Sequence, residues 1–143
     1  MWFAQASPCW LPTGTLSASN AFEPRMATGI DPRLNGLTGL AVTKLDVLGG
    51  LDSLNICTGY EYQGKTLDYF PGDLQILGDC KPIYETLPGW SEDISGVRNF
   101  NDLPENTKKY LKRIEEIVET PVQIISIGPA RDETIVLENP LSE

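Results

Sequence analysis

A lysine and an aspartate two residues apart are the side chains in this sequence best placed to do chemistry. Lys44 and Asp46 lie at the carboxyl end of a short aliphatic run, residues 40–42, that is opened by glycine. An apolar run of this kind without helical spacing predicts a buried strand of an α/β sheet. Ligands of open α/β sheets bind at the carboxyl ends of the strands. The sequence therefore predicts a ligand site that begins at Lys44.

The carboxylate of Asp46 is suited to guanine. It can accept two parallel hydrogen bonds, which guanine offers from N1–H and its exocyclic amine, whereas adenine has an acceptor at N1. The stem of Lys44 could cover the face of the base. A Lys-x-Asp pair taken alone is more often a solvated surface pair, so this assignment depends on its context.

A second buried strand is predicted over residues 122–127, and Ser126, Ile127 and Gly128 lie at its carboxyl end. If this strand is parallel to the first and near it, the two ends form two walls of one cleft. The serine hydroxyl and backbone N–H groups could then donate to the carbonyl oxygen of guanine while Asp46 accepts from its other edge. An ordinary exit from strand to turn is the alternative.

The elements that must position these residues can be read from the periodicity. Apolar residues at spacings of three and four predict one helix over about residues 103–119. A strand follows this helix at once, which favours a crossover onto a parallel sheet. Alternating residues and a Gln63-Gly64 turn predict an antiparallel hairpin over about residues 54–69. We expect the α/β class, with a partial, mostly parallel sheet.

Composition excludes several classes of function. The 20 acidic residues outnumber the 11 basic ones, for a net charge of -9, which disfavours nucleic-acid binding. No apolar run approaches the ~20 residues of a membrane helix, so no membrane association is expected. The 3 cysteines are widely spaced, which fits a reducing cytoplasm. The chain has no histidine, so it cannot supply a histidine base or metal ligand.

Four segments, in order, resemble the carboxyl-terminal third of adenylosuccinate synthetase. They are residues 35–52, 56–60, 82–90 and 125–135, and the resemblance extends from Asn35 to the end of the chain. It implies a fragment of a larger, P-loop-like fold of a GTP-dependent carbon–nitrogen ligase. This family serves purine biosynthesis and forms adenylosuccinate from IMP and L-aspartate with hydrolysis of GTP.

The resemblance also implies which residues bind the nucleotide. Family contacts to GTP map onto Lys44, Leu45, Asp46, Ser126, Ile127 and Gly128. GTP is then a substrate, and Mg²⁺ is expected for the family. IMP and L-aspartate would be partners only of the complete enzyme, and the family is typically a homodimer.

Several parts of the family pattern are not found in this sequence. There is no Gly-Asp-Glu-Gly-Lys-Gly-Lys phosphate loop, and neither the catalytic aspartate of that loop nor the catalytic histidine is present. We therefore assign no catalytic residue and no metal ligand, and expect the chain alone to be inactive. Residues 1–34 are expected to be an irregular tail unlike the family, and residues 35–143 the guanine-recognition portion. The alternatives are a non-catalytic module that binds guanine nucleotide or pairs with a subunit, and an inert gene fragment.

Overall fold

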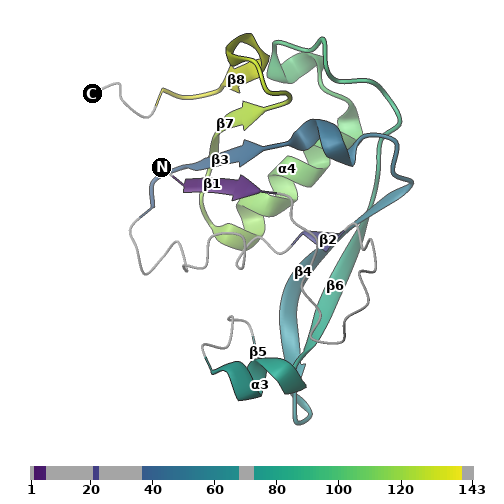
Figure 1. Ribbon diagram of the computed structural model, residues 1–143, viewed down its shortest axis with the longest axis vertical. Helices are drawn as coiled ribbons and strands as arrows, with labels where there is room; N and C mark the ends of the chain where they lie inside the picture. The colour runs from purple at the N-terminus through teal and green to yellow at the C-terminus, as the bar shows by residue number, and fades with distance from the viewer. Residues whose placement is uncertain (1, 6–20, 23–36, 68–72, 140–143) are drawn as a thin grey trace.

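The strand predicted before Lys44 is present and lies inside a four-stranded sheet. The computed structural model describes residues 2–5, 21–22, 37–67 and 73–139 (Figure 1). The sheet has the order β1-β3-β7-β8 and is formed by β1 (Trp2–Gln5), β3 (Leu40–Thr43), β7 (Val122–Ser126) and β8 (Thr134–Val136). The pairs β1–β3 and β3–β7 are parallel, and β8 runs antiparallel to β7. The prediction of a mostly parallel sheet is therefore confirmed.

Strand β3 owes its place in the sheet to its apolar side chains. Leu40, Ala41 and Val42 are all buried, as expected for a parallel strand that is covered on both faces. The Leu40 N–H donates to the Pro121 carbonyl at 2.8 Å, which joins the entry of β3 to that of β7. In the ladder Val42 lies opposite Ile125.

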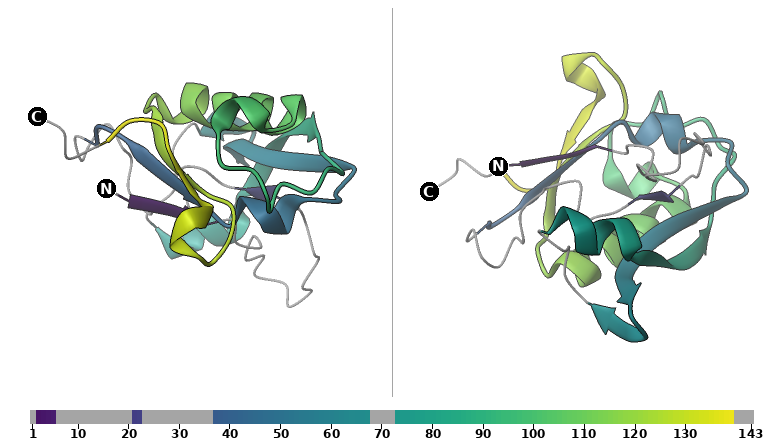
Figure 2. Two further views of the ribbon diagram at one scale, coloured as in Figure 1. Left: turned by 90° about the horizontal axis from the view of Figure 1, so that it is seen from above. Right: turned by 60° about the horizontal axis from the view of Figure 1, so that its bottom comes forward.

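The predicted helix is α4 (Glu105–Val118), within two residues of the expected range. Its apolar stripe of Tyr110, Leu111, Ile114 and Val118 is buried, and it packs into one core with β3 and β7 (Figure 2). Glu119 ends the helix with a left-handed φ of 55°. The Glu115 carboxylate accepts a hydrogen bond from the Val122 N–H at 2.7 Å, so the end of the helix is joined directly to β7.

A second sheet is built on the predicted hairpin. Strand β4 (Ser53–Tyr62) pairs antiparallel with β5 (Lys65–Leu67), and the hairpin is confirmed up to Leu67. Gln63 and Gly64 both have positive φ, 49° and 75°, as a type I′ turn requires. The longer partner of β4 is β6 (Lys81–Pro88), and β2 (Ala21–Phe22) pairs with β4 as well. Residues 68–69, where the hairpin was expected to end, lie outside the described residues.

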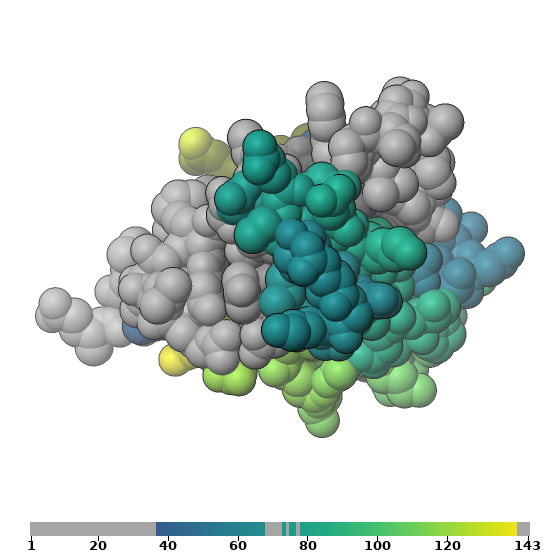
Figure 3. Space-filling view, turned by 90° about the horizontal axis from the view of Figure 1, so that it is seen from below, coloured from purple at the N-terminus to yellow at the C-terminus, as the bar shows by residue number. Residues whose placement is uncertain are grey.

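Strands β4, β5 and β6 form an arm that extends away from the first sheet (Figure 1). A short helix, α3 (Leu74–Asp79), precedes β6 at the far end of this arm. Figure 3 views the molecule from this end, where residues of the arm make up the central, blue and teal part of the surface. Ile83 and Tyr84 of β6 are among the exposed large hydrophobic residues.

Trp90 fixes the base of the arm against α4. Its ring is buried and tilted by 57° against Tyr110, with 5.8 Å between the ring centroids. Its carbonyl accepts a hydrogen bond from the Gly50 N–H at 2.8 Å, and Asn106 of α4 donates to the Gly89 carbonyl at 2.7 Å. A Cβ on Gly89 would overlap the Leu51 carbonyl, so only glycine fits this crossing.

The irregular tail expected over residues 1–34 contains two regular elements. Strand β1 lies beside β3, and β2 contacts β4 at residues 55 and 56. With 4 and 2 residues, both strands are too short to produce a readable period. The other residues of this stretch lie outside the described part. No helix in that described part is long and apolar enough to cross a membrane.

Candidate functional site

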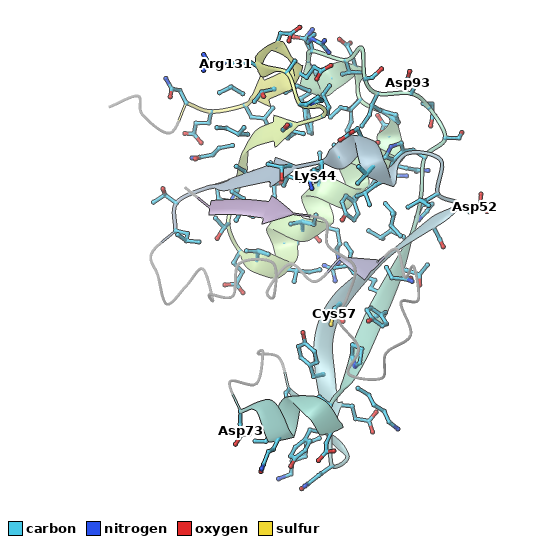
Figure 4. The ribbon with its side chains drawn as sticks, in the orientation of Figure 1. Lys44, Asp52, Cys57, Asp73, Asp93 and Arg131 are labelled. Carbon is cyan, nitrogen blue, oxygen red and sulfur yellow. The ribbon has the colours of Figure 1, made fainter. Side chains whose placement is uncertain are left out.

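The segment after β3 turns sharply and presents two charged side chains. Lys44 follows β3 with a left-handed φ of 59° and precedes the 3-10 helix η1 (Leu45–Leu48). Leu45 is fully buried and anchors η1 in the core, while Lys44 and Asp46 are exposed on either side of it. Figure 4 labels Lys44 at the end of β3. The strand-to-helix turn therefore presents both side chains outside the core.

The segment after β7 forms a tight loop that closes at β8. Ile127 is buried, and the Ser126 hydroxyl donates to the Gly128 carbonyl at 2.9 Å. The 3-10 helix η3 (Arg131–Glu133) then leads into β8, which returns alongside β7 with Thr134 opposite Ser126. This return fixes both ends of the loop that contains Gly128.

The two segments leave the same edge of the sheet. Strands β3 and β7 are parallel neighbours, and Val42 lies opposite Ile125. Lys44 comes two residues after Val42 and Ser126 one residue after Ile125, so both lie at the same end of the strand pair. The structure thus brings the segments 44–46 and 126–128 to one edge, as the sequence predicted for parallel neighbouring strands. Leu45 and Ile127 take part in this edge only through their main chains, since their side chains lie in the core.

The hydrogen bonds of the 127–130 loop leave one donor available. The Ile127 N–H donates to the Glu133 carbonyl at 2.9 Å, and the Ala130 N–H donates to the Glu133 carboxylate at 2.9 Å. Pro129 has no N–H. Within residues 127–130, the N–H of Gly128 is the one that donates to no acceptor among the residues that the structure describes. A ligand at this edge with a carbonyl oxygen can accept from it.

An acidic pocket of about 220 Å³ lies beside Asp46. It is lined by Asp46, Gly49, Gly50, Ser91, Glu92, Asp93 and Ile94. Glu92 accepts a hydrogen bond from the Ser91 N–H at 3.1 Å, and Asp93 accepts one from the Ser95 N–H at 2.9 Å. The hydrogen bonds from Ser95 hold the pKa of the Asp93 carboxyl below its usual range, so this group stays ionised at neutral pH.

The pocket beside Asp46 favours one kind of ligand edge. Three carboxyl groups attract hydrogen-bond donors and repel phosphate, so a base edge rich in N–H groups suits it better than a triphosphate chain. Residues 126–128 are not part of its lining. Within the residues that the structure describes, no group of three or more His, Cys, Asp or Glu side chains could hold a metal ion.

Sequence reasoning did not single out Glu133, Glu92 or Asp93. Glu133 follows Ala130 by three positions, the spacing at which a glutamate returns to the N–H at the start of a helix. That spacing was available in the sequence as a signal. The pocket residues 91–94 are far from Asp46 in the sequence and share no local pattern with it, so spacing did not indicate that they line one pocket.

Comparison with known proteins identifies the relatives of this chain. A family model described as adenylosuccinate synthetase matches residues 27–135, starting eight residues before the resemblance seen in the sequence. The chain is 67% identical over 110 residues to an adenylosuccinate synthetase of Desulfatibacillum aliphaticivorans, covering 77% of this chain and 26% of that protein. It is 59% identical over 110 residues to the one of Desulfosudis oleivorans, with the same coverage, 77% and 26%.

A solved structure is similar as well. The structure of fully ligated adenylosuccinate synthetase from Plasmodium falciparum superposes with a TM-score of 0.74 at 36% sequence identity. The matched region makes up 80% of this chain and 28% of the Plasmodium falciparum chain. The chain therefore spans about a quarter of the length of the relatives that it matches.

Proposed function

Since this chain belongs to the adenylosuccinate synthetase family, we propose that it is the carboxyl-terminal part of an enzyme of that activity and supplies its guanine-binding wall. The complete enzyme would join IMP and L-aspartate with hydrolysis of GTP. Residues 35–143 would be the guanine-recognition portion, to whose sheet β1 adds a strand from residues 1–34. The nucleotide contacts would come from Lys44, Leu45, Asp46, Ser126, Ile127 and Gly128.

The observation that carries this proposal is the pairing of β3 with β7. It brings an acceptor, the Asp46 carboxylate, and a donor, the Gly128 N–H, to the same edge of one sheet. Guanine presents the complementary set, N1–H and the exocyclic amine beside the carbonyl oxygen. Adenine presents an amine in place of the carbonyl and an acceptor at N1, so both contacts would oppose it.

The charge of the site supports a contact with the base and not with the phosphates. Asp46, Glu92 and Asp93 surround the pocket beside η1, where a triphosphate would be repelled. We therefore place the phosphate loop, the ligands of Mg²⁺ and the catalytic aspartate and histidine in the rest of the enzyme. The remaining proposals follow from the family: guanine nucleotide as the partner of this chain, assembly as a homodimer, and a cytoplasmic location.

The test is a change of base preference in a complete enzyme. We would exchange the matching segment of the Desulfatibacillum aliphaticivorans relative for this chain's residues and introduce Asp46→Asn. The substitution turns one acceptor into a donor, so use of GTP should weaken by at least about 2 kcal/mol in kcat/KM. Use of xanthosine triphosphate should improve, because its carbonyl at position 2 accepts where guanine donates.

The control separates hydrogen bonding from charge. Glu92→Gln removes one negative charge from the same pocket and leaves Asp46 in place, so it should not improve use of xanthosine triphosphate. The measurement is kcat/KM for both nucleotides in the wild type and both variants. An unchanged preference for GTP in Asp46→Asn would mean that Asp46 does not read the base.

A further inference from the structure

Glu133 lies at the end of η3 and closes the loop that carries the Gly128 N–H. We propose that it is a positioning residue, which holds the 127–130 loop in the shape that directs this N–H toward the carbonyl oxygen of the base. This inference rests on the proposed recognition of guanine. It adds a residue that makes no contact with the nucleotide itself.

The main chain of Glu133 holds both ends of the loop. Its carbonyl accepts from the Ile127 N–H at 2.9 Å, and its N–H donates to the Ala130 carbonyl at 3.1 Å. The first bond continues the β7–β8 ladder, in which Ser126 lies opposite Thr134, and the second lies within the turn of η3. They are independent of the side chain at position 133, so the ends of the loop should survive substitutions there.

The side chain of Glu133 contacts the loop on both sides of Pro129. Its carboxylate accepts from the Ala130 N–H at 2.9 Å. It also packs directly on Gly128, since a Cβ added to Gly128 would lie 2.6 Å from Cδ of Glu133. The carboxylate therefore occupies the space that a side chain at position 128 would need. Both flanks of Pro129 are fixed in this way.

The carboxylate acts here as an acceptor of correct shape and not as a charge. Its neighbour Asp132 pairs with Arg98 at 3.5 Å, but Glu133 forms no ion pair with a lysine or arginine of the described residues. A glutamine has the same length and keeps one oxygen that can accept from Ala130. It should replace the glutamate in this role.

Removal of the carboxylate should loosen the loop. Gly128 would lose the group that packs on it, and glycine has more accessible backbone conformations than any other residue. The loop would then have to be ordered when the nucleotide binds, at a cost in affinity. Because the base lies far from the bond that is broken, this cost should raise KM for GTP and leave kcat unchanged.

The experiment compares Glu133→Ala and Glu133→Gln in the complete enzyme described above. We expect KM for GTP to rise about tenfold in Glu133→Ala with unchanged kcat, and to return near the wild-type value in Glu133→Gln. Asp132→Ala is the control, since it removes the adjacent, exposed carboxylate. An unchanged KM in Glu133→Ala would overturn the inference, and so would a Glu133→Gln variant as impaired as Glu133→Ala.

A nucleotide analogue distinguishes this inference from the proposed function. In 6-thioguanosine triphosphate sulfur, a weak acceptor, replaces the carbonyl oxygen, while N1–H and the amine remain. The wild type should prefer GTP to this analogue, and Glu133→Ala should reduce that preference. A wild-type preference that persists in full in Glu133→Ala would refute only the positioning role. Equal use of both nucleotides by the wild type would refute the contact between the loop and the base.

Discussion

At the scale of single residues, Lys44 is in a backbone conformation that lysine rarely adopts. Its φ of 59° lies in the left-handed region, where a Cβ is too close to the following carbonyl oxygen. Strain of this kind gathers at functional sites, where the surrounding structure maintains it. Glycine would meet the same turn without strain. A left-handed φ alone does not establish a role for the lysine side chain, because Gln63 and Glu119 share it, so the role needs a direct test.

Replacement of Lys44 by glycine should separate stability from binding. Lys44→Gly relieves the strained φ and should raise the free energy of unfolding by about 0.5 kcal/mol, since the flexibility of glycine in the unfolded chain offsets part of the gain. KM for GTP should rise several-fold because the stem over the base is lost. Thermal unfolding and steady-state kinetics of the complete enzyme measure the two effects.

Gln63 provides the control for Lys44, since it has a φ of 49° in the turn of the arm. Gln63→Gly should show a similar gain in stability with no change in KM. A Lys44→Gly variant that is more stable and binds GTP as before would exclude a role for the lysine stem.

At the scale of elements, an ion pair links the arm to α4. Arg113 shares its Nε–H between the two carboxylate oxygens of Glu85 of β6 at 3.0 Å and donates from Nη2 to the same group at 2.7 Å. Its Nη1 donates to Glu116 at 2.9 Å. These hydrogen bonds raise the pKa of Arg113. Both side chains of the Arg113–Glu85 pair are about a third exposed, so solvent screens much of the attraction.

Loss of the Glu85 carboxylate should weaken this link by a modest amount. Glu85→Gln keeps the size of the side chain and removes the charge-assisted pair, so the free energy of unfolding should fall by about 0.5–1 kcal/mol. Glu116→Gln, which breaks only the pair within α4, should cost about half as much or less. A double-mutant cycle with Arg113→Met in chemical denaturation measures the coupling. A coupling energy near zero would show that the arm docks on α4 without this pair.

The elements that periodicity predicted are those whose buried faces repeat along the chain. Helix α4 and the β4–β5 hairpin have such a pattern, whereas β3 was predicted from a continuous apolar run that begins after Gly39. No strand is predicted at β6 from the sequence, because Pro82 and Pro88 interrupt its pattern and the side chains of Ile83 and Tyr84 are exposed. Strand β8, with 3 residues, exists through its pairing with β7 and has no period of its own.

The candidate site was predictable to the extent that it lies at strand ends. The turn after β3 and the loop after β7 could be placed at one edge because parallel neighbours end together. The Glu133 carboxylate returns to the Ala130 N–H over three residues, a spacing that the sequence contains. The burial of Leu45 and Ile127 and the left-handed φ of Lys44 depend instead on tertiary contacts. Those contacts are between residues that are not adjacent in any repeating pattern, so the sequence did not indicate them.

At the scale of the whole molecule, the chain matches only a quarter of its relatives' length. Purified alone, it should form no adenylosuccinate from IMP, L-aspartate and GTP. The 143 residues include no histidine for a general acid and no phosphate-loop motif. The assay should include the complete enzyme with the same segment as a positive control. Product formation by the chain alone would mean that other residues carry out the chemistry.

The pairing of β3 with β7 also has a consequence for the order in which the chain folds. Val42 and Ile125 lie roughly 80 residues apart in the sequence, so their contact requires closure of a long loop before any ladder energy is gained. The β4–β6 ladder and helix α4 form within shorter stretches of chain between them. We therefore expect local structure to form first and the edge that holds Asp46 and Gly128 to form late in folding. A correctly formed edge would then require that the elements between β3 and β7 have already folded.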